Sequence, residues 1–169
     1  MTTLPQTSTD SRPPLWAALA IAILPVVAAS VAGSAVTVPQ IPTWYAGLIK
    51  PSFNPPNWIF APVWTALYAL MALGVFRILR LPVGIPGRRR ALLVYHLQLL
   101  FNIGWSFAFF GANSPVAGLI VILPLLVLIA ATIAAFRPLD RLASNLFWPY
   151  LAWVAFATLL NASIWWLNR

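Results

Sequence analysis

The sequence lacks cysteine altogether and has very few charged residues. Without cysteine, the chain cannot form disulfides, thiolate metal sites or thiol nucleophiles. Only 7% of its 169 residues are charged, whereas soluble domains carry about 25%. Because 62% of the residues are hydrophobic, a chain of this composition cannot cover itself with a surface that water tolerates. A soluble globular fold is therefore excluded.

Acidic residues are almost absent, because Asp10 and Asp140 are the only two. No pair of carboxylates is available for general acid–base catalysis. The sequence also has no glycine-rich phosphate loop and no nucleophile with a neighbouring base. His96 is the only histidine, so we expect no metal site, and we expect His96 to bond to a neighbouring helix. Ion-coupled transport is disfavoured as well, since it needs ionisable groups inside the membrane.

Basic residues are more numerous, and the formal net charge is +8. Nucleic-acid binding would need these charges on one folded surface. Instead, half of them flank a single short connection: Arg77, Arg80, Arg88, Arg89 and Arg90. In a hydrophobic chain such clustering sets membrane topology, so no nucleic-acid partner is expected.

Long apolar runs are what the sequence has in abundance. A bilayer is crossed by roughly 20 apolar residues, and five such runs follow one another, bounded by glycine, proline or arginine. They predict an all-α integral membrane protein, a bundle of five transmembrane helices in residues 15–169, after a disordered tail at 1–14. The expected helices cover 15–36, 58–79, 91–111, 116–136 and 145–167.

The distribution of positive charge predicts the orientation. Eight of the ten basic residues fall in the tail and in the second and fourth connections, and only Lys50 and Arg169 fall on the other side. The positive-inside rule then places the N-terminus in the cytoplasm. We expect a multi-pass protein of a bacterial cell membrane, with the lipid bilayer as a partner. A cleaved signal peptide at 15–36 is the alternative, but this run exceeds the roughly 7–15 residues of a signal core.

The connection at residues 38–57 is rich in proline and aromatic residues. Proline cannot donate a backbone hydrogen bond, so the segment is predicted to be neither helix nor sheet. It is also too aromatic for a plain flexible linker, and we expect it to fold onto the bundle as a lid. A linker whose aromatic side chains lie at the lipid interface is the alternative. The candidate lid residues are Trp44, Tyr45, Pro51, Pro55 and Pro56.

Three of the expected helices each carry a stripe of aromatic, amide and small residues at helical spacing. The stripes are Trp64, Tyr68 and Met71; Gln98, Asn102, Ser106 and Phe109; and Tyr150, Trp153, Ala157 and Asn161. Polar residues in membrane helices usually face the bundle interior. The stripes therefore describe a cavity with indole and phenol walls that suits a flat aromatic ligand. Simple packing between helices is the alternative.

Three sequence blocks carry a family resemblance. Residues 44–58 read WYAGLIKPSFNPPNW and residues 62–68 read PVWTALY, similar to W-Y-x-x-L-x-K-P-x-x-x-P-P and W-x-x-L-Y of the translocator-protein (tryptophan-rich sensory protein, TspO/MBR) family. The family's next block is resembled by Gln98-Leu99, Asn102, Trp105 and the F-F-G at 109–111. Its last block is resembled by PYLAW at 149–153 and by Leu160-Asn161. The chain is identified as a bacterial-type member.

This resemblance implies a five-helix bundle, commonly dimeric, that binds tetrapyrroles such as protoporphyrin and haem as ligands and needs no cofactor. The animal members carry a tyrosine and an arginine for sterol recognition at the end of the last helix, but here Ala162 follows Leu160-Asn161, so sterol binding is not implied. The expected ligand-binding residues are Phe60, Ala61, Trp64, Tyr68, Gln98, Asn102, Trp105, Trp153, Ala157, Leu160 and Asn161.

The expected function is that of a membrane receptor or regulator acting in tetrapyrrole transport or stress regulation. One alternative is light-dependent porphyrin degradation, with Trp64 and Trp153 handling radical intermediates; another is a passive porphyrin or sterol carrier. Small residues at Gly104, Ala108 and Ala112 predict a homodimer interface, because they let membrane helices approach closely. Packing against another helix of the same chain would use the same strip.

Overall fold

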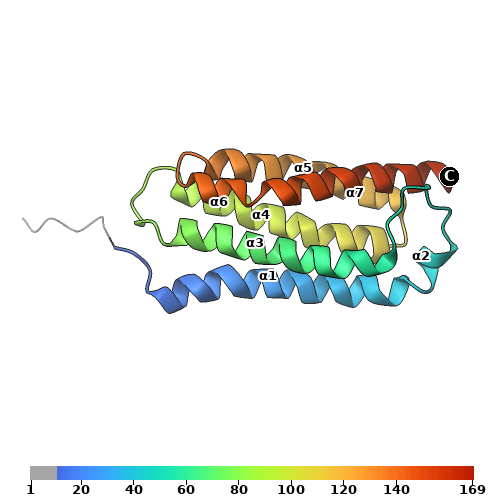
Figure 1. Ribbon diagram of the computed structural model, residues 1–169, viewed down its shortest axis with the longest axis horizontal. Helices are drawn as coiled ribbons and strands as arrows, with labels where there is room; N and C mark the ends of the chain where they lie inside the picture. The colour runs from blue at the N-terminus through green and yellow to red at the C-terminus, as the bar shows by residue number, and fades with distance from the viewer. Residues whose placement is uncertain (1–10) are drawn as a thin grey trace, which may run out of the picture.

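A computed structural model of the chain describes residues 11–169 as an elongated bundle of helices (Figure 1). Within this range, five helical segments are long and apolar enough to cross a membrane, and no strand is present. The predicted fold class, an all-α bundle of five membrane helices, is confirmed. Most of the expected disordered tail, residues 1–10, lies outside the described residues.

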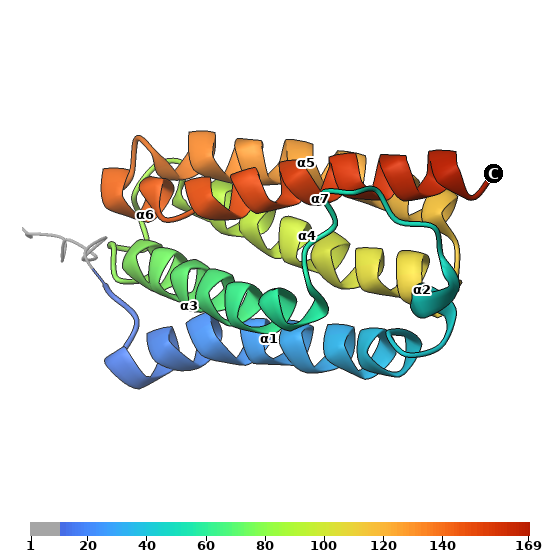
Figure 2. The same ribbon diagram turned by 45° about the vertical axis from the view of Figure 1, so that its right-hand side comes forward.

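The first two membrane helices lie side by side (Figure 2). α1 (Leu15–Thr37) packs against both α3 (Phe60–Leu79) and α4 (Arg88–Ser106). The helix expected at 58–79 starts as a 3₁₀ turn, η2 (Asn57–Ile59), before α3 begins. Pro55 and Pro56 precede this turn, and a helix cannot extend back through them because they have no N–H to donate.

The connection between α1 and α3 is partly helical, so the prediction that it contains no helix is wrong. It holds a 3₁₀ turn, η1 (Val38–Gln40), and one turn of α-helix, α2 (Trp44–Gly47). Pro39 lies in the first turn of η1, where its missing N–H would have no partner anyway. The four residues of α2 include no proline, so nothing prevents a single helical turn there.

The helix expected at 91–111 starts three residues earlier, at Arg88. The Arg88 side chain is buried, and it donates to the carbonyl oxygens of Ile78 at 3.1 Å and Leu79 at 3.0 Å. These are carbonyls of the last turn of α3, which have no partner within their own helix. The arginine that looked like part of a loop therefore joins two helices. α4 continues into a π-helical turn, η3 (Phe107–Gly111).

The last two membrane helices are antiparallel neighbours. α5 (Pro115–Phe136) packs against α4 and against α7 (Trp148–Leu167). The single helix expected at 145–167 is wrong at its start, because a short helix, α6 (Arg141–Asn145), comes first and the chain bends before α7. Asp140 begins α6 by accepting the Ala143 N–H at 2.9 Å, as helix caps do.

The bundle is tightly packed at the end that carries α6. The rings of Tyr95, Phe136 and Phe147 are fully buried, with centroids 5.3 to 6.2 Å apart. Gly74 makes room for this cluster, since a Cβ there would lie 2.7 Å from the Phe147 ring. An ion pair of 2.7 Å joins Arg77 to Asp140 at this end. The opposite half of the bundle, below α2, is hollow.

Candidate functional site: an aromatic cavity beneath the first loop

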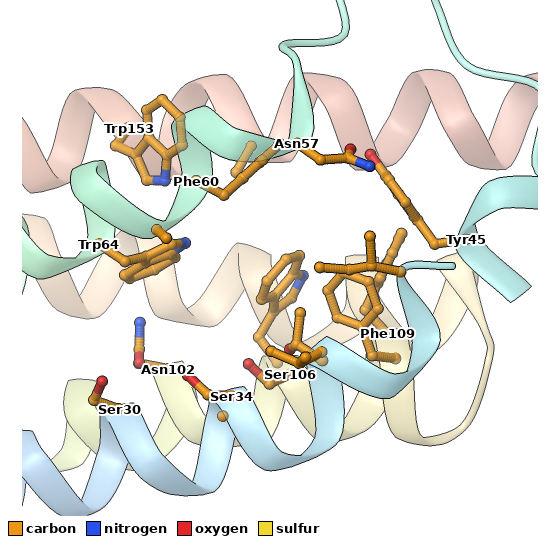
Figure 3. Close-up of a pocket in the computed structure, with 18 of the residues that line it drawn as sticks. Ser30, Ser34, Tyr45, Asn57, Phe60, Trp64, Asn102, Ser106, Phe109 and Trp153 are labelled. Atoms are coloured by element: carbon orange, nitrogen blue, oxygen red, sulfur yellow. The ribbon is translucent and has the colours of Figure 1, made fainter. Parts of the chain in front are cut away.

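A cavity of about 280 Å³ lies in the half of the bundle that carries α2 (Figure 3). Its walls come from α1, α3, α4, η3, α7 and the connection between α1 and α3. Ten of the eleven expected ligand-binding residues line it: Phe60, Ala61, Trp64, Tyr68, Asn102, Trp105, Trp153, Ala157, Leu160 and Asn161. The three helical stripes read from the sequence therefore meet around one space.

Aromatic rings form one side of the cavity. The Trp64 ring lies 5.4 Å from that of Tyr68, and the Phe60 ring meets that of Trp153 edge-on at 5.8 Å. Figure 3 shows Trp64, Phe60 and Trp153 together on the side opposite α1. Offset and edge-on contacts of this kind fix the ring planes. The wall is therefore preformed for stacking against a flat ligand.

A hydrogen-bonded group forms the floor. The Tyr68 hydroxyl donates to Oδ1 of Asn102 at 2.8 Å, and Nδ2 of Asn102 donates to the Tyr150 hydroxyl at 2.9 Å. Tyr150 is fully buried below the cavity and does not line it. Asn102 is held in one orientation by two tyrosines from two other helices, which closes the cavity toward the packed end.

Asn161 orients one of the indoles. Its Oδ1 accepts the Trp105 N–H at 3.3 Å, while its Nδ2 donates to the carbonyl oxygen of Pro115 at 2.8 Å. Gly118 allows α5 to come this close, because a Cβ there would lie 2.6 Å from Oδ1 of Asn161. Both ends of the Asn161 amide are thus engaged by the protein, and its role is to position Trp105.

Two sequence expectations in α4 are wrong. Gln98 does not line the cavity: it is fully buried below it, with Nε2 at 3.9 Å from the sulfur of Met71. The stripe that contains Gln98 continues past the cavity floor, and periodicity alone does not mark where the floor lies. His96 bonds within its own helix, its Nδ1 lying 2.7 Å from the Leu92 carbonyl oxygen, and not to a neighbouring helix.

The connection between α1 and α3 covers the outer end of the cavity. Tyr45 is buried and lines the cavity, and Trp44 packs edge-on against Phe109 at 5.3 Å. The Tyr45 hydroxyl donates to Oδ1 of Asn54 at 2.9 Å, and Asn57 also lines the space. The segment therefore packs onto the bundle and covers the cavity, and its action as a lid stays a prediction. The candidate lid residues Pro51, Pro55 and Pro56 lie in the same segment but do not line the cavity.

The lid is tied to the end of α7. The Ile49 N–H donates to Oδ1 of Asn168 at 3.0 Å, and Nδ2 of Asn168 donates to the Ile49 carbonyl oxygen at 2.9 Å. Phe53 meets Phe156 edge-on at 6.3 Å. In Figure 2 the segment between α2 and α3 passes over α7 before it returns to α3. These contacts join positions that are far apart in the sequence.

Several cavity residues were not expected from the sequence. α1 contributes a row of small and polar side chains: Ser30, Gly33, Ser34 and Thr37. Ser30–Ala35 is rich in small residues, and that signal also fits a signal-peptide cleavage site. Ser106 and Phe109 line the cavity too, and both belong to the stripe noted on the third expected helix. The run of small residues at 30–35 was the signal for these α1 residues, if it is interpreted as one wall of a cavity.

The small-residue strip, which begins at Gly104 on α4, continues at Ala108 in η3 and ends at Ala112 after it, meets α5 of the same chain at Gly104. A Cβ at Gly104 would lie 3.7 Å from Val121 of α5, an ordinary contact distance. Ala108 is half-buried and Ala112 is exposed. Of the two possibilities left open for this strip, the structure supports packing within the chain at Gly104.

Comparison with known proteins gives a consistent result. The TspO/MBR family model matches residues 20–167. The chain is 40% identical to the "Tryptophan-rich protein TspO" of Chlorobaculum tepidum over 150 residues, 89% of this chain and 95% of that protein. It is 43% identical to the "Tryptophan-rich sensory protein" of Cereibacter sphaeroides over 118 residues, covering 70% and 72%. It is 40% identical to the human "Translocator protein" over 123 residues, covering 72% and 73%.

Proposed function

Because the chain belongs to the TspO/MBR family, we propose that it binds a tetrapyrrole in the aromatic cavity and acts in the transport of that ligand or in stress regulation. Family membership supports a membrane receptor or regulator of the TspO type. The tetrapyrrole is a ligand in this proposal, and the protein needs no cofactor. We further propose a bacterial cell membrane as its location, with the N-terminus in the cytoplasm.

The observation that carries the proposal is the indole wall of the cavity. Trp64, Trp105 and Trp153 come from three different helices and line one space. Each indole offers a large apolar face, and stacking on such faces is favourable for a planar aromatic ring system. A tetrapyrrole macrocycle is the kind of flat apolar ligand that this wall would accommodate.

Quenching of intrinsic fluorescence tests the proposal. We expect protoporphyrin to quench tryptophan emission at micromolar concentration, and Trp64→Phe or Trp153→Phe to weaken binding by about fivefold or more, as loss of roughly 1 kcal/mol of stacking predicts. Trp16→Phe is the matched control, because Trp16 lies in the first turn of α1, is 74% exposed and does not line the cavity. If the two cavity variants bind as tightly as the Trp16 variant, the ligand does not occupy this cavity.

A second function, light-dependent porphyrin degradation, is favoured by one further observation. Trp64 and Trp153 both line the cavity, and the Trp64 ring lies 5.4 Å from that of Tyr68. Indole and phenol rings are the side chains here that are most readily oxidised. Illumination of bound protoporphyrin should then give new absorbance bands that are lost in Trp64→Phe. Identical spectra in the light and in the dark would leave binding as the only activity.

A further inference from the structure

Hydroxyl groups in these membrane helices follow a common pattern. Thr132 donates to the Leu128 carbonyl at 2.8 Å, and Ser163 donates to the Leu159 carbonyl at 2.9 Å. Each bonds to the carbonyl four residues earlier in its own helix, and Thr65 and Thr158 do the same. A hydroxyl that faces lipid or an apolar neighbour has no other acceptor, so this internal bond is the usual solution.

Four hydroxyl side chains that line the cavity depart from this pattern: three serines, and Thr37 at the end of α1. Within residues 11–169, the side chains of Ser30 and Ser34 on α1 and Ser106 on α4 form no hydrogen bond, although each could donate one. Figure 3 shows their oxygen atoms directed into the cavity, across from Trp64 and Trp153. Gly33 brings the two helices together here, since a Cβ at Gly33 would lie 3.2 Å from Oγ of Ser106. The cavity therefore has a hydroxyl wall facing an aromatic wall.

The charge around the cavity restricts what these hydroxyls can bind. Among the described residues that line it, none carries a charge. Lys50 lies in the lid, but its ammonium donates to the carbonyl oxygens of Ala46 at 3.3 Å and Leu48 at 3.1 Å. A carboxylate buried without a cation loses more hydration than hydroxyl donors replace. An uncharged acceptor, such as a carbonyl, an ester or a ring nitrogen, has no such penalty.

The size of the cavity supports the same conclusion. Its volume of about 280 Å³ is just below the roughly 300–1,000 Å³ typical of ligand pockets. Ser34 on α1 and Thr65 on α3 line the cavity and are also exposed, and we place its opening between these two helices. A ligand as large as a macrocycle would insert one edge and project through this opening. Acid groups on the opposite edge would then remain outside.

We propose that Ser30, Ser34 and Ser106 form a donor wall that selects flat aromatic ligands carrying an uncharged hydrogen-bond acceptor on the inserted edge. For a tetrapyrrole, this statement rests on the function proposed above: an esterified or otherwise uncharged porphyrin edge enters the cavity, and carboxylates stay at its mouth. The aromatic wall supplies stacking, and the serine wall supplies the discrimination between ligands of equal shape.

A pair of small probes tests the wall without assuming a tetrapyrrole. Benzanthrone, a four-ring ketone, and benzanthrene, the matching hydrocarbon, differ at one carbonyl, and their binding can be followed by tryptophan quenching. The ketone oxygen can accept from at most two of the three hydroxyls, so we expect at least one of Ser30→Ala, Ser34→Ala and Ser106→Ala, and the triple variant, to weaken ketone binding by about 2- to 10-fold, the range of one neutral hydrogen bond. Hydrocarbon binding should stay unchanged. Ser163→Ala is the control, because Ser163 is a half-buried serine that does not line the cavity and bonds within its own helix.

Helical circular dichroism and gel filtration establish that the variants are folded. If the triple Ser→Ala variant binds the ketone as tightly as the parent, the serines bond elsewhere and the proposal is wrong. Equal losses for ketone and hydrocarbon would also overturn it, because a general change in the cavity would then explain both.

The porphyrin version compares protoporphyrin with its dimethyl ester. We expect the ester to bind at least as tightly as the diacid and to be the more sensitive of the two to the serine changes. If the diacid binds more than about 10-fold tighter than the ester, the cavity accepts carboxylates. The donor-wall proposal would then be wrong, and the proposal of tetrapyrrole binding would stand. If the parent binds neither porphyrin but the ketone depends on the serines, the tetrapyrrole function is wrong and the donor wall stands.

Discussion

The indole N–H of Trp105 on α4 donates to Oδ1 of Asn161 on α7 at 3.3 Å. The same amide donates to the Pro115 carbonyl at the start of α5, so Asn161 links three membrane helices at the edge of the cavity. If the Asn161 amide is lost, the Trp105 N–H and the Pro115 carbonyl lose their partner. In the apolar environment of a membrane bundle, no water is nearby to replace it.

Asn161→Leu should therefore lower the free energy of unfolding by about 1–3 kcal/mol, the cost of leaving buried polar groups unpaired. It should also shift the tryptophan emission, because the Trp105 indole loses its fixed partner. Thermal unfolding in detergent and emission spectra check both. Thr158→Val on the same helix is the control, since the Thr158 hydroxyl bonds only to its own helix at 2.8 Å. Parent-like stability and emission in Asn161→Leu would remove this link from the architecture.

Asn168 should control how long the lid stays closed. Asn168→Ala removes two hydrogen bonds to Ile49, and we expect the Ile49 amide to exchange with deuterium faster. Release of protoporphyrin, if it binds as proposed, should quicken by about 2- to 10-fold. Hydrogen exchange followed by mass spectrometry and stopped-flow release measure the two effects. Asn145→Ala, an exposed asparagine at the opposite end, is the control.

Replacing Pro51, Pro55 and Pro56 with glycine should act in the same direction by a different route. Proline limits the conformations open to the released loop, so glycine makes the closed lid entropically less favourable. Helix content should not change. Unaltered exchange and release in both the proline and the Asn168 variants would mean that the segment only connects α1 to α3.

Acid should weaken the end of the bundle that carries α6, through Asp140. Burial raises the pKa of this carboxyl, but the Ala143 N–H and the Arg77 guanidinium outweigh that effect, so the pKa lies below its ordinary value of 3.8. Because the folded-state pKa is the lower one, the contribution of Asp140 to stability is present above 3.8 and is lost as the pH falls through the folded-state pKa.

Asp140→Asn should therefore flatten the dependence of the melting temperature on pH below about pH 4. It should cost up to about 1 kcal/mol at neutral pH, because Arg77 is partly exposed and the ion pair is screened. Asp140→Ala should cost about 0.5–2 kcal/mol more, since it also removes the helix cap. Asp140 is the only acidic side chain in residues 11–169, so no other carboxylate side chain in this range contributes to the acid transition. A parent-like acid transition in Asp140→Asn would refute the assignment.

The two ends of the small-residue strip should have different roles, one in packing within the chain and the other in dimer assembly. Gly104→Ala should be tolerated, whereas Gly104→Leu should push α4 from Val121 of α5 and cost about 1–3 kcal/mol of stability. The homodimer proposed from the sequence would then use the exposed end of the strip. Ala112→Leu should weaken it without changing the melting temperature. Native mass measurement in detergent reports the dimer, and the melting temperature reports packing within the chain. A dimer unaffected by Ala112→Leu would show that the interface lies on another helix.

The sequence by itself determined the five membrane helices and most of the aromatic side of the cavity. Length and apolarity are local properties of a run, so the runs ending near Leu79 and Phe136 could be placed without a fold. The stripes on three helices, with Trp64, Asn102 and Trp153, could be read because their polar and aromatic residues stand out from apolar neighbours at helical spacing.

Only the tertiary structure decided which side of α1 joins the cavity and where the cavity ends. α1 is apolar nearly all round, so no stripe marks Ser30 and Ser34 as inward-facing, and their role depends on α3 and α4 packing beside them. Gln98 has the same periodicity as Asn102 yet lies below the floor. Arg88 joins α3, and Asn168 holds the lid, through contacts between segments that no local pattern connects. Helical periodicity shows which face of a helix a residue is on. Only the packing of several helices shows where along the bundle the cavity begins and ends.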